Sequence, residues 1–318
     1  TNRCARGWGA CTILSGVEWT YTYVRFFVFE EPTMSLRSEL KAAGHQAGGS
    51  FKTKANREAA VGRFCSYLQA NNLQVSSIAK MKTSHLERYA KDMLLRDLAA
   101  RTVQSELSAL RSTLTAAGRE KLGRNVSNNA LGIARASRAG TRTAMGAAKF
   151  AEVRRYVGRR DGGVAACIEL QRALGLRAKE AIMSQDSLGT WATAIARGNP
   201  CKIIRGTKGG RARDVRPVNV AAAQAAIAQA QNICEKNGGK LFSGRSLKSA
   251  MARYHNVMHA AGATGTNTGH SLRYAFARDQ FEDYIGQGLT RREALAATAL
   301  DLGHGDGRGR WVERVYLR

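Results

Sequence analysis

Apolar residues recur every three or four positions through residues 51–123, which is the spacing of one face of an α-helix. Phe64 and Leu68 belong to one such stripe in "REAAVGRFCSYLQ", and Val103 and Leu107 to another in "TVQSELSALRSTLTAAGR". The positions between the stripes are polar and often basic. The pattern predicts three or four short amphipathic helices that together make a small all-helical domain.

The same helical spacing returns after Lys149, but one segment breaks it. The stretch 201–220 reads "CKIIRGTKGGRARDVRPVNV", with two short strand-like runs and Gly209 and Gly210 near the middle. Apolar runs around paired glycines are typical of a β-hairpin. We therefore predict a mainly α fold: an α+β domain with a small antiparallel sheet, preceded by the all-α domain. Its helices are expected at 149–159, 163–174, 219–235, 246–261, 269–286 and 291–301.

Composition suggests where the domains divide. Residues 122–148 are rich in Gly, Ser, Asn, Ala and Arg and have little apolar periodicity, as expected of a basic linker. We predict an N-terminal extension outside the fold at 1–47, the helical domain at 48–121, the linker, and a catalytic domain at 149–318.

The first 33 residues differ from the rest of the chain. They precede the first methionine, Met34, and hold two of the four Trp and two of the six Cys. We interpret them as translated upstream sequence, with a genuine accessory arm as the alternative.

The charge balance points to a polyanionic partner. The chain has 50 Lys plus Arg against 24 Asp plus Glu, a net charge of +26, and such an excess favours nucleic acid binding. A ribosomal or chromatin-type packing protein is the plain alternative. A membrane surface fits less well, because the charges are spread along the chain instead of lying on one amphipathic helix.

The cysteines and the apolar runs exclude other classes. None of the six cysteines forms a C-x-x-C pair or has zinc-site spacing, so they are expected to be small core residues in a reducing cytosol. The longest apolar stretch, residues 12–29, is interrupted by Glu18 and Arg25. No membrane span is expected.

Several short motifs could carry chemistry, although each alone has a plainer interpretation. In "TGHSLRYAFA" His270 and Arg273 share a helical face, which is also common for surface pairs. Arg177 in "RALGLRAKEA" is suited to grip a phosphate, but with Glu180 it could equally form an ion pair. Lys208 in "GTKGG" lies in the predicted hairpin. The spacing there is not that of a P-loop.

The last motif is "DLGHGDGRGRWVERVYLR", residues 301–318. His304 lies between glycines after a predicted helix, and "WVERVY" could form a helical turn that presents Tyr316. Only Leu317 and Arg318 follow the tyrosine. We therefore expect its position to be weakly fixed until DNA or a neighbouring subunit orders it.

The order of these motifs over residues 48–318 resembles the tyrosine recombinase, or phage integrase, family. That family carries an arginine, a hairpin lysine, H-x-x-R, L-G-H and a C-terminal tyrosine in this order. The spacing from His304 to Tyr316 is a few residues longer than is common in the family, and many members continue into a helix that docks on a neighbour. The matching positions are Arg177, Lys208, His270, Arg273, His304 and Tyr316.

The resemblance implies a site-specific recombinase or integrase of a phage or other mobile element. It would cut and rejoin duplex DNA through a 3′-phosphotyrosyl intermediate, without metal, ATP or other cofactor. The implied partners are duplex DNA, three further copies of the chain on paired sites, and accessory directionality factors. The implied location is the cytoplasm, with the nucleoid.

The resemblance also assigns roles to these residues. Tyr316 would be the nucleophile and His270 its base, with Arg177 and Arg273 on the non-bridging phosphate oxygens. His304 would donate a hydrogen bond to the phosphate, and Lys208 would protonate the leaving 5′-oxygen. Two alternatives stay open: a type IB topoisomerase-like enzyme that relaxes DNA, and a catalytically decayed DNA-binding remnant of a mobile element.

Overall fold

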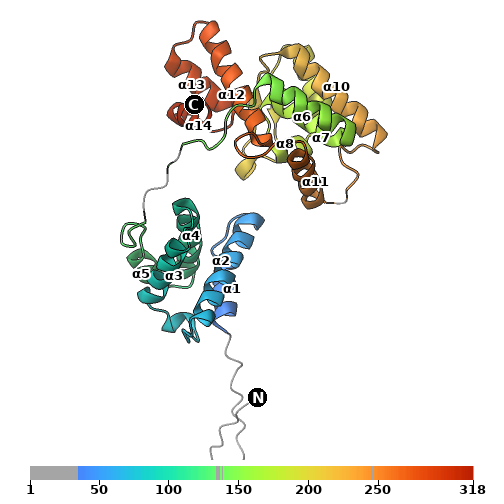
Figure 1. Ribbon diagram of the computed structural model, residues 1–318. Helices are drawn as coiled ribbons and strands as arrows, with labels where there is room; N and C mark the ends of the chain where they lie inside the picture. The colour runs from blue at the N-terminus through green and yellow to red at the C-terminus, as the bar shows by residue number, and fades with distance from the viewer. Residues whose placement is uncertain (1–34, 134–136, 138, 245, 318) are drawn as a thin grey trace, which may run out of the picture. The chain divides into compact units, whose positions relative to one another are not determined.

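The computed structural model describes residues 35–133, 137, 139–244 and 246–317. Within these ranges the chain forms two compact units that divide after residue 136. Figure 1 shows both as assemblies of helices. Each unit has its own hydrophobic core, so the units are described separately.

The first unit is entirely helical in its described part, as the sequence predicted. Its core contains the predicted stripe residues Phe64, Leu68, Val103 and Leu107, all nearly inaccessible to solvent. Besides a short 3₁₀ turn at Ile78–Lys80, its helices are α1 (Leu36–Gln46), α2 (Phe51–Ala70), α3 (Thr83–Leu95), α4 (Ala100–Ala116) and α5 (Glu120–Asn125).

The predicted extension over residues 1–47 is wrong in its last part. Ser35 caps α1 by accepting a hydrogen bond from the backbone N–H of Ser38, and Leu40 of this helix is only 1% exposed. Helix α1 packs against α2 and α4, because its apolar residues lie at helical spacing on one face. The suspected upstream stretch 1–33 lies outside the described residues.

The linker predicted over residues 122–148 is also shorter than expected. Leu122, Val126 and Ile133 are buried in the core of the first unit, and Met145 is buried in the core of the second. Isolated apolar residues in a polar segment therefore anchor both of its ends.

The second unit is helical with one small sheet, which confirms the predicted fold class. Strands β1 (Cys201–Ile203) and β2 (Arg213–Val215) pair antiparallel, with Cys201 opposite Val215 and Ile203 opposite Arg213. Each of the six helices predicted between residues 149 and 301 has a counterpart within two residues at each end, and α8 and α9 are additional. The helices are α6 (Ala147–Arg160), α7 (Gly162–Leu174), α8 (Ala178–Ile182), α9 (Leu188–Ala196), α10 (Val220–Lys236), α11 (Leu247–Ala260), α12 (Gly269–Gly286), α13 (Arg291–Asp301) and α14 (Gly309–Tyr316).

Helix α7 is the central element of this unit. It packs against α6, α10 and α12, and the carboxylate of Asp161 caps its first turn by accepting from the N–H of Val164. It ends at Gly175, whose left-handed backbone (φ 58°) is the usual helix C-terminus. A Cβ atom there would lie 2.3 Å from the ring of Phe276 on α12. The glycine thus turns the chain where only its hydrogen atom fits, just before Leu176 and Arg177.

Within the described residues, none of the helices combines the length and the apolar character that crossing a membrane would require.

Candidate active site

Arg177 occupies the N-cap position of α8. Its backbone N–H donates to Oε2 of Glu180 at 2.8 Å, and its guanidinium NH1 donates to Oε1 at 2.7 Å. The arginine side chain is 24% exposed, whereas that of Glu180 is fully buried. The ion pair considered from the sequence is therefore present, and the Arg177 side chain keeps part of its surface accessible.

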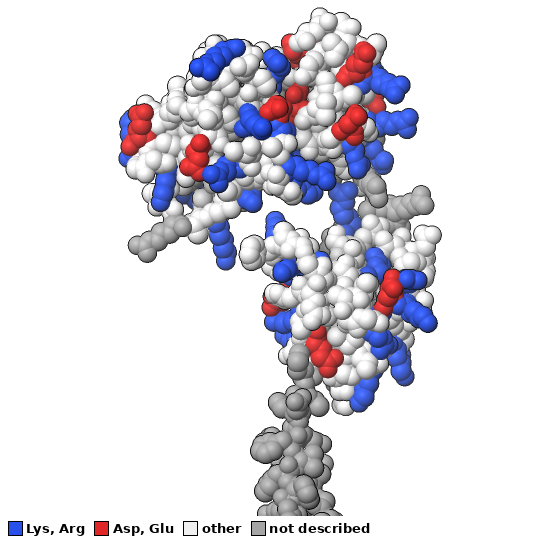
Figure 2. All heavy atoms as spheres, turned by 180° about the vertical axis from the view of Figure 1, so that it is seen from behind, with Lys and Arg blue, Asp and Glu red and all other residues white. Residues whose placement is uncertain are grey.

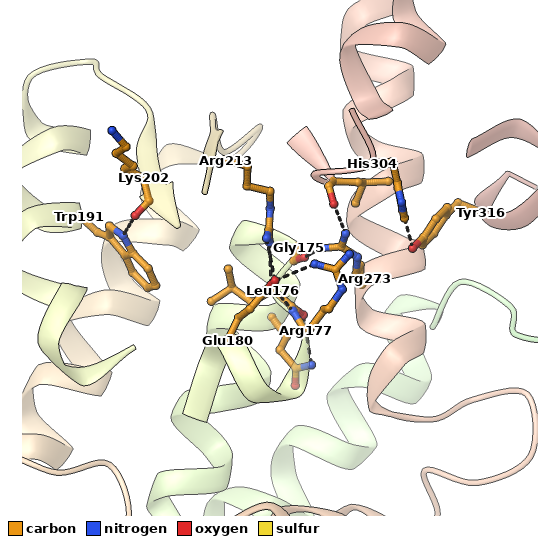
Figure 3. Close-up of polar contacts among 12 residues, drawn as sticks. Gly175, Leu176, Arg177, Glu180, Trp191, Lys202, Arg213, Arg273, His304 and Tyr316 are labelled. Carbon is orange, nitrogen blue, oxygen red and sulfur yellow. Dashed lines mark hydrogen bonds and ion pairs between the residues drawn. The ribbon is translucent and has the colours of Figure 1, made fainter. Parts of the chain in front are cut away.

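Glu180 also binds a second arginine that the sequence interpretation missed. Arg213 on β2 donates from NH1 to Oε1 at 2.8 Å and from NH2 to Oε2 at 2.7 Å, and its side chain is 4% exposed. Figure 3 shows it pointing from the sheet toward Glu180 and Arg177. Burial would raise the pKa of Glu180, but the hydrogen bonds and charge of Arg213 outweigh it and hold that pKa at about 2.

A sequence signal for Arg213 did exist. Residues two apart in a strand face the same side of a sheet, and Arg213 and Val215 are both buried while Asp214 between them is exposed. Once Val215 is taken as a core residue of the hairpin, the alternation directs Arg213 inward.

Lys208 lies in the turn between β1 and β2 and is exposed to solvent. Among the described residues no hydrogen bond or ion pair holds its ammonium group. The base of the hairpin is fixed, because a Cβ on Gly206 would lie 2.8 Å from the carbonyl oxygen of Lys179 in α8. The structure thus anchors the hairpin beside Arg177 and leaves the lysine free of the other predicted residues.

Arg273 on α12 is the most buried of the predicted cations, with no exposed surface. Its NH1 donates to the carbonyl oxygen of Gly175 and its NH2 to that of Leu302. Nε has no partner among the described residues. Burial lowers its pKa to about 10, so the group stays charged at neutral pH. Arg273 thereby joins the turn before Arg177 to the segment that carries His304.

His270 lies at the start of α12, with its ring centroid 6.3 Å from that of Tyr316. The side chain keeps access to solvent. Neighbouring protein atoms displace water from part of the ring, and this desolvation is the main reason that the pKa of His270 is lowered to about 4. The positive charges of Arg273 and Arg177 lower it further. The imidazole is therefore neutral at neutral pH, which is the form that accepts a proton.

The C-terminal segment places the last two predicted residues in contact. His304 follows α13, and its Nε2 atom lies 3.1 Å from the hydroxyl oxygen of Tyr316 at the end of α14. Burial and then the charge of Arg273 lower the pKa of His304 to about 3, so this imidazole is neutral too.

The expectation that Tyr316 is weakly fixed is wrong for the isolated chain. Its side chain is 5% exposed, and its ring packs 4.5 Å from that of Tyr274 on α12. Helix α14 confirms the predicted helical turn, and its buried residues Val312 and Val315 join the core. These apolar positions at helical spacing hold the tyrosine in place.

Five of the six predicted residues therefore converge, and Lys208 stands apart. Arg177, Arg273, His304 and Tyr316 lie near one another in Figure 3, and His270 faces the ring of Tyr316. Two guanidinium groups, two neutral imidazoles and a hydroxyl make a site suited to an anionic, tetrahedral substrate. Among the described residues, no three His, Cys, Asp or Glu side chains gather as metal ligands do.

Comparisons with known proteins identify the family of this chain. The family model described as "Integrase" matches residues 132–279, and the model described as "Phage integrase, N-terminal" matches residues 34–123. The chain therefore belongs to the phage integrase family of tyrosine recombinases. The first match includes Arg177, Lys208, His270 and Arg273 and ends before His304.

Solved structures share the fold at low sequence identity. A lambda integrase tetramer bound to a Holliday junction superposes with a TM-score of 0.54 at 15% identity, covering 88% of this chain and 77% of that one. The Tn1549 transposon integrase in complex with transposon right end DNA has a TM-score of 0.55 at 13% identity, covering 88% of this chain and 94% of that one. A dimer of lambda integrase residues 75–356 bound to a core site has a TM-score of 0.56 at 14% identity, covering 88% of this chain and 95% of that one. The search of curated protein sequences found no match.

Proposed function

We propose that this protein is a site-specific DNA recombinase that cuts and rejoins strands through a covalent bond between Tyr316 and a 3′-phosphate. The observation that carries the proposal is the convergence of Arg177, Arg273, His304 and Tyr316, supported by the family membership. A tyrosine hydroxyl has a pKa of about 10, so its attack on phosphorus needs a nearby base and a positive environment.

In the proposed step the hydroxyl oxygen of Tyr316 bonds to the scissile phosphorus while the bond from phosphorus to the 5′-oxygen breaks. The tyrosine proton passes to a neutral imidazole, and the leaving oxygen takes a proton from Lys208. Arg177 and Arg273 bind the non-bridging oxygens, where negative charge develops. Because one phosphoester replaces another, rejoining needs no external energy source.

Two imidazoles near Tyr316 are candidates for the base. The family resemblance assigns that role to His270, whereas in the DNA-free protein the imidazole that touches the hydroxyl is that of His304. Both rings have a pKa of about 4 or below, so each can accept a proton at neutral pH. Substitution of each residue separates the two roles, as set out in the Discussion.

Binding to DNA is supported by the surface charge. Figure 2 shows Lys and Arg side chains over both units, with fewer Asp and Glu. We infer that both units and the basic segment that joins them bind duplex DNA, with most contacts on phosphates. We infer further that exchange occurs in a tetramer on paired sites in the cytoplasm, and that directionality factors are candidate partners.

A suicide substrate tests the proposal. A nicked duplex that loses a short fragment after cleavage traps the covalent protein–DNA adduct, which a denaturing gel detects. We expect adduct with wild type and with Tyr274→Phe, which keeps the packed ring, and none with Tyr316→Phe. An adduct that survives Tyr316→Phe would contradict the nucleophile assignment. Absence of adduct with wild type on its cognate site would favour the decayed remnant, and plasmid relaxation without strand exchange would favour the topoisomerase.

A further inference from the structure

The buried carboxylate of Glu180 is shared between two arginines in unequal ways. Oε1 accepts from Arg177 NH1 and Arg213 NH1, and Oε2 accepts from the backbone N–H of Arg177 and from Arg213 NH2. Arg213 thus engages the carboxylate with both terminal nitrogens, as a parallel fork. Arg177 engages it with one guanidinium nitrogen.

The two arginines also differ in what remains free. Arg213 donates to Glu180 with both terminal nitrogens, and its side chain is only 4% exposed. Arg177 is 24% exposed, and a guanidinium group has five N–H donors. Within the described residues its remaining guanidinium donors make no other side-chain hydrogen bond. They are therefore available to a ligand.

A count of charges shows what Arg213 contributes. Arg177, Glu180 and Arg213 together carry a net charge of +1, and Arg213 balances the carboxylate. Without Arg213, the positive charge of Arg177 would be the nearest one left to balance Glu180. A guanidinium already paired with a buried carboxylate gains less from binding a phosphate.

We propose that Arg213 is a positioning residue that supplies the counter-charge of Glu180 and so leaves the charge and free donors of Arg177 to the scissile phosphate. The proposal rests on the function proposed above. It assigns Arg213 no contact with DNA.

The surroundings of Arg213 hold it in this role. Its strand belongs to the hairpin that carries Lys208, and the base of that hairpin packs on α8 at Gly206. On its other side, a Cβ on Gly303 would lie 2.8 Å from the Cδ atom of Arg213. One buried side chain therefore contacts the segment of Arg177 and the segment of His304 from the hairpin strand.

The test is a double-mutant cycle on Arg213→Gln and Glu180→Gln. Cleavage of the suicide substrate is followed in a single turnover at saturating DNA, so that only the bound step is measured. We expect Arg213→Gln to slow cleavage by about 10²-fold, the scale of losing one transition-state donor. Adding Glu180→Gln removes the unbalanced negative charge, and we expect the double variant to cleave at least about tenfold faster than Arg213→Gln. Arg211→Gln, an exposed position on the same hairpin, controls for the loss of one positive charge.

A second readout does not depend on cleavage. Inorganic phosphate, added to the DNA-free protein, should raise the thermal unfolding temperature of wild type and the double variant more than that of Arg213→Gln. If the rise in unfolding temperature caused by phosphate follows this order but neither wild type nor any variant cleaves DNA, the proposed function fails and the role of Arg213 stands.

Three results would overturn the role of Arg213. One is cleavage by Arg213→Gln at the rate of Arg211→Gln. Another is a folded double variant that cleaves the substrate no faster than Arg213→Gln. Should Arg213→Gln not fold, the double variant is compared directly with wild type, and a folded double variant as slow as Arg177→Ala contradicts the proposal.

Discussion

The Nε2 atom of His304 lies 3.1 Å from the hydroxyl oxygen of Tyr316, although the two residues are 12 positions apart in the chain. The loop after α13 and the short helix α14 create this contact. Because the imidazole is neutral, it can either accept the hydroxyl proton or, with its other nitrogen protonated, hold the hydroxyl in place.

The first prediction distinguishes His304 from His270 as the base. General acid–base catalysis contributes about 10²–10⁴-fold, so removing the base should cost this much in single-turnover cleavage. Among the described residues, His304 is the one that hydrogen-bonds to the hydroxyl of Tyr316. We therefore expect His304→Ala to lower the cleavage rate at least as much as His270→Ala. A much smaller loss for His304→Ala would return the role of base to His270. His259→Ala, an exposed residue on α11, serves as the control.

The second prediction concerns stability and pH. The ordinary histidine pKa is 6.5, and those of His270 and His304 are lowered to about 4 and about 3 in the folded protein. Between pH 6.5 and 4 the unfolded chain therefore binds more protons than the folded one, so stability falls as the pH falls through this window. Thermal unfolding at pH 7 and pH 5 measures the effect. In His304→Gln, the dependence on pH should weaken, and an unchanged slope would contradict the lowered pKa.

The third prediction uses two glycines of the loop after α13. Gly303 has φ 64°, and a Cβ there would meet Arg213, whereas Gly305 has φ 83° with nothing within 4 Å. Gly305→Ala should cost only the backbone strain, about 1 kcal/mol of unfolding free energy. Gly303→Ala should cost more, up to about 3 kcal/mol, and should also slow cleavage. Chemical denaturation compares the two, and equal losses would argue against the contact with Arg213.

The fourth prediction concerns the segment that leads into the second unit. Gly140 donates its N–H to the carbonyl oxygen of Arg314 at 3.4 Å, and a Cβ there would lie 2.1 Å from the carbonyl oxygen of Val315 and 3.0 Å from the hydroxyl of Tyr274. Gly140→Ala should therefore shift the end of α14 and slow adduct formation. Gly158→Ala, where a Cβ meets nothing within 4 Å, should not. Wild-type rates for Gly140→Ala would show that the segment does not support the tyrosine.

The fifth prediction tests the inferred contacts with DNA phosphates. With a net charge of +26, binding should release many counterions. If 6–10 phosphates are contacted, affinity should fall by about 10³-fold or more between about 50 and about 200 mM salt. Fluorescence anisotropy with a labelled duplex measures this slope. A nearly flat response would contradict DNA binding through many phosphate contacts.

The helices could be predicted because each depends on the local spacing of apolar residues along the chain. The stripe through Phe64 and Leu68 and the hairpin around Gly209 depend on neighbours a few residues away. The start of the first unit could not be placed as well, because α1 is short and owes its stability to packing on α2 and α4. The prediction for 1–47 left this helix outside the fold.

The candidate site divides in the same way. The order of the Arg177, H-x-x-R and L-G-H motifs was sufficient to recognise the family, because it does not depend on distances in space. The missed residue, Arg213, belongs to no motif. Its importance comes from a partner, Glu180, that lies 33 positions earlier in the chain.

The sequence by itself determined the helices, the small sheet, the family and the identity of the six candidate residues, since each follows from spacing along the chain. Tertiary structure alone decided how those residues are held. It buried Tyr316 against Tyr274, joined it to His304, and paired Arg213 with Glu180. These outcomes depend on packing between segments far apart in the chain, where burial removes water and makes charge pairing and close contacts decisive.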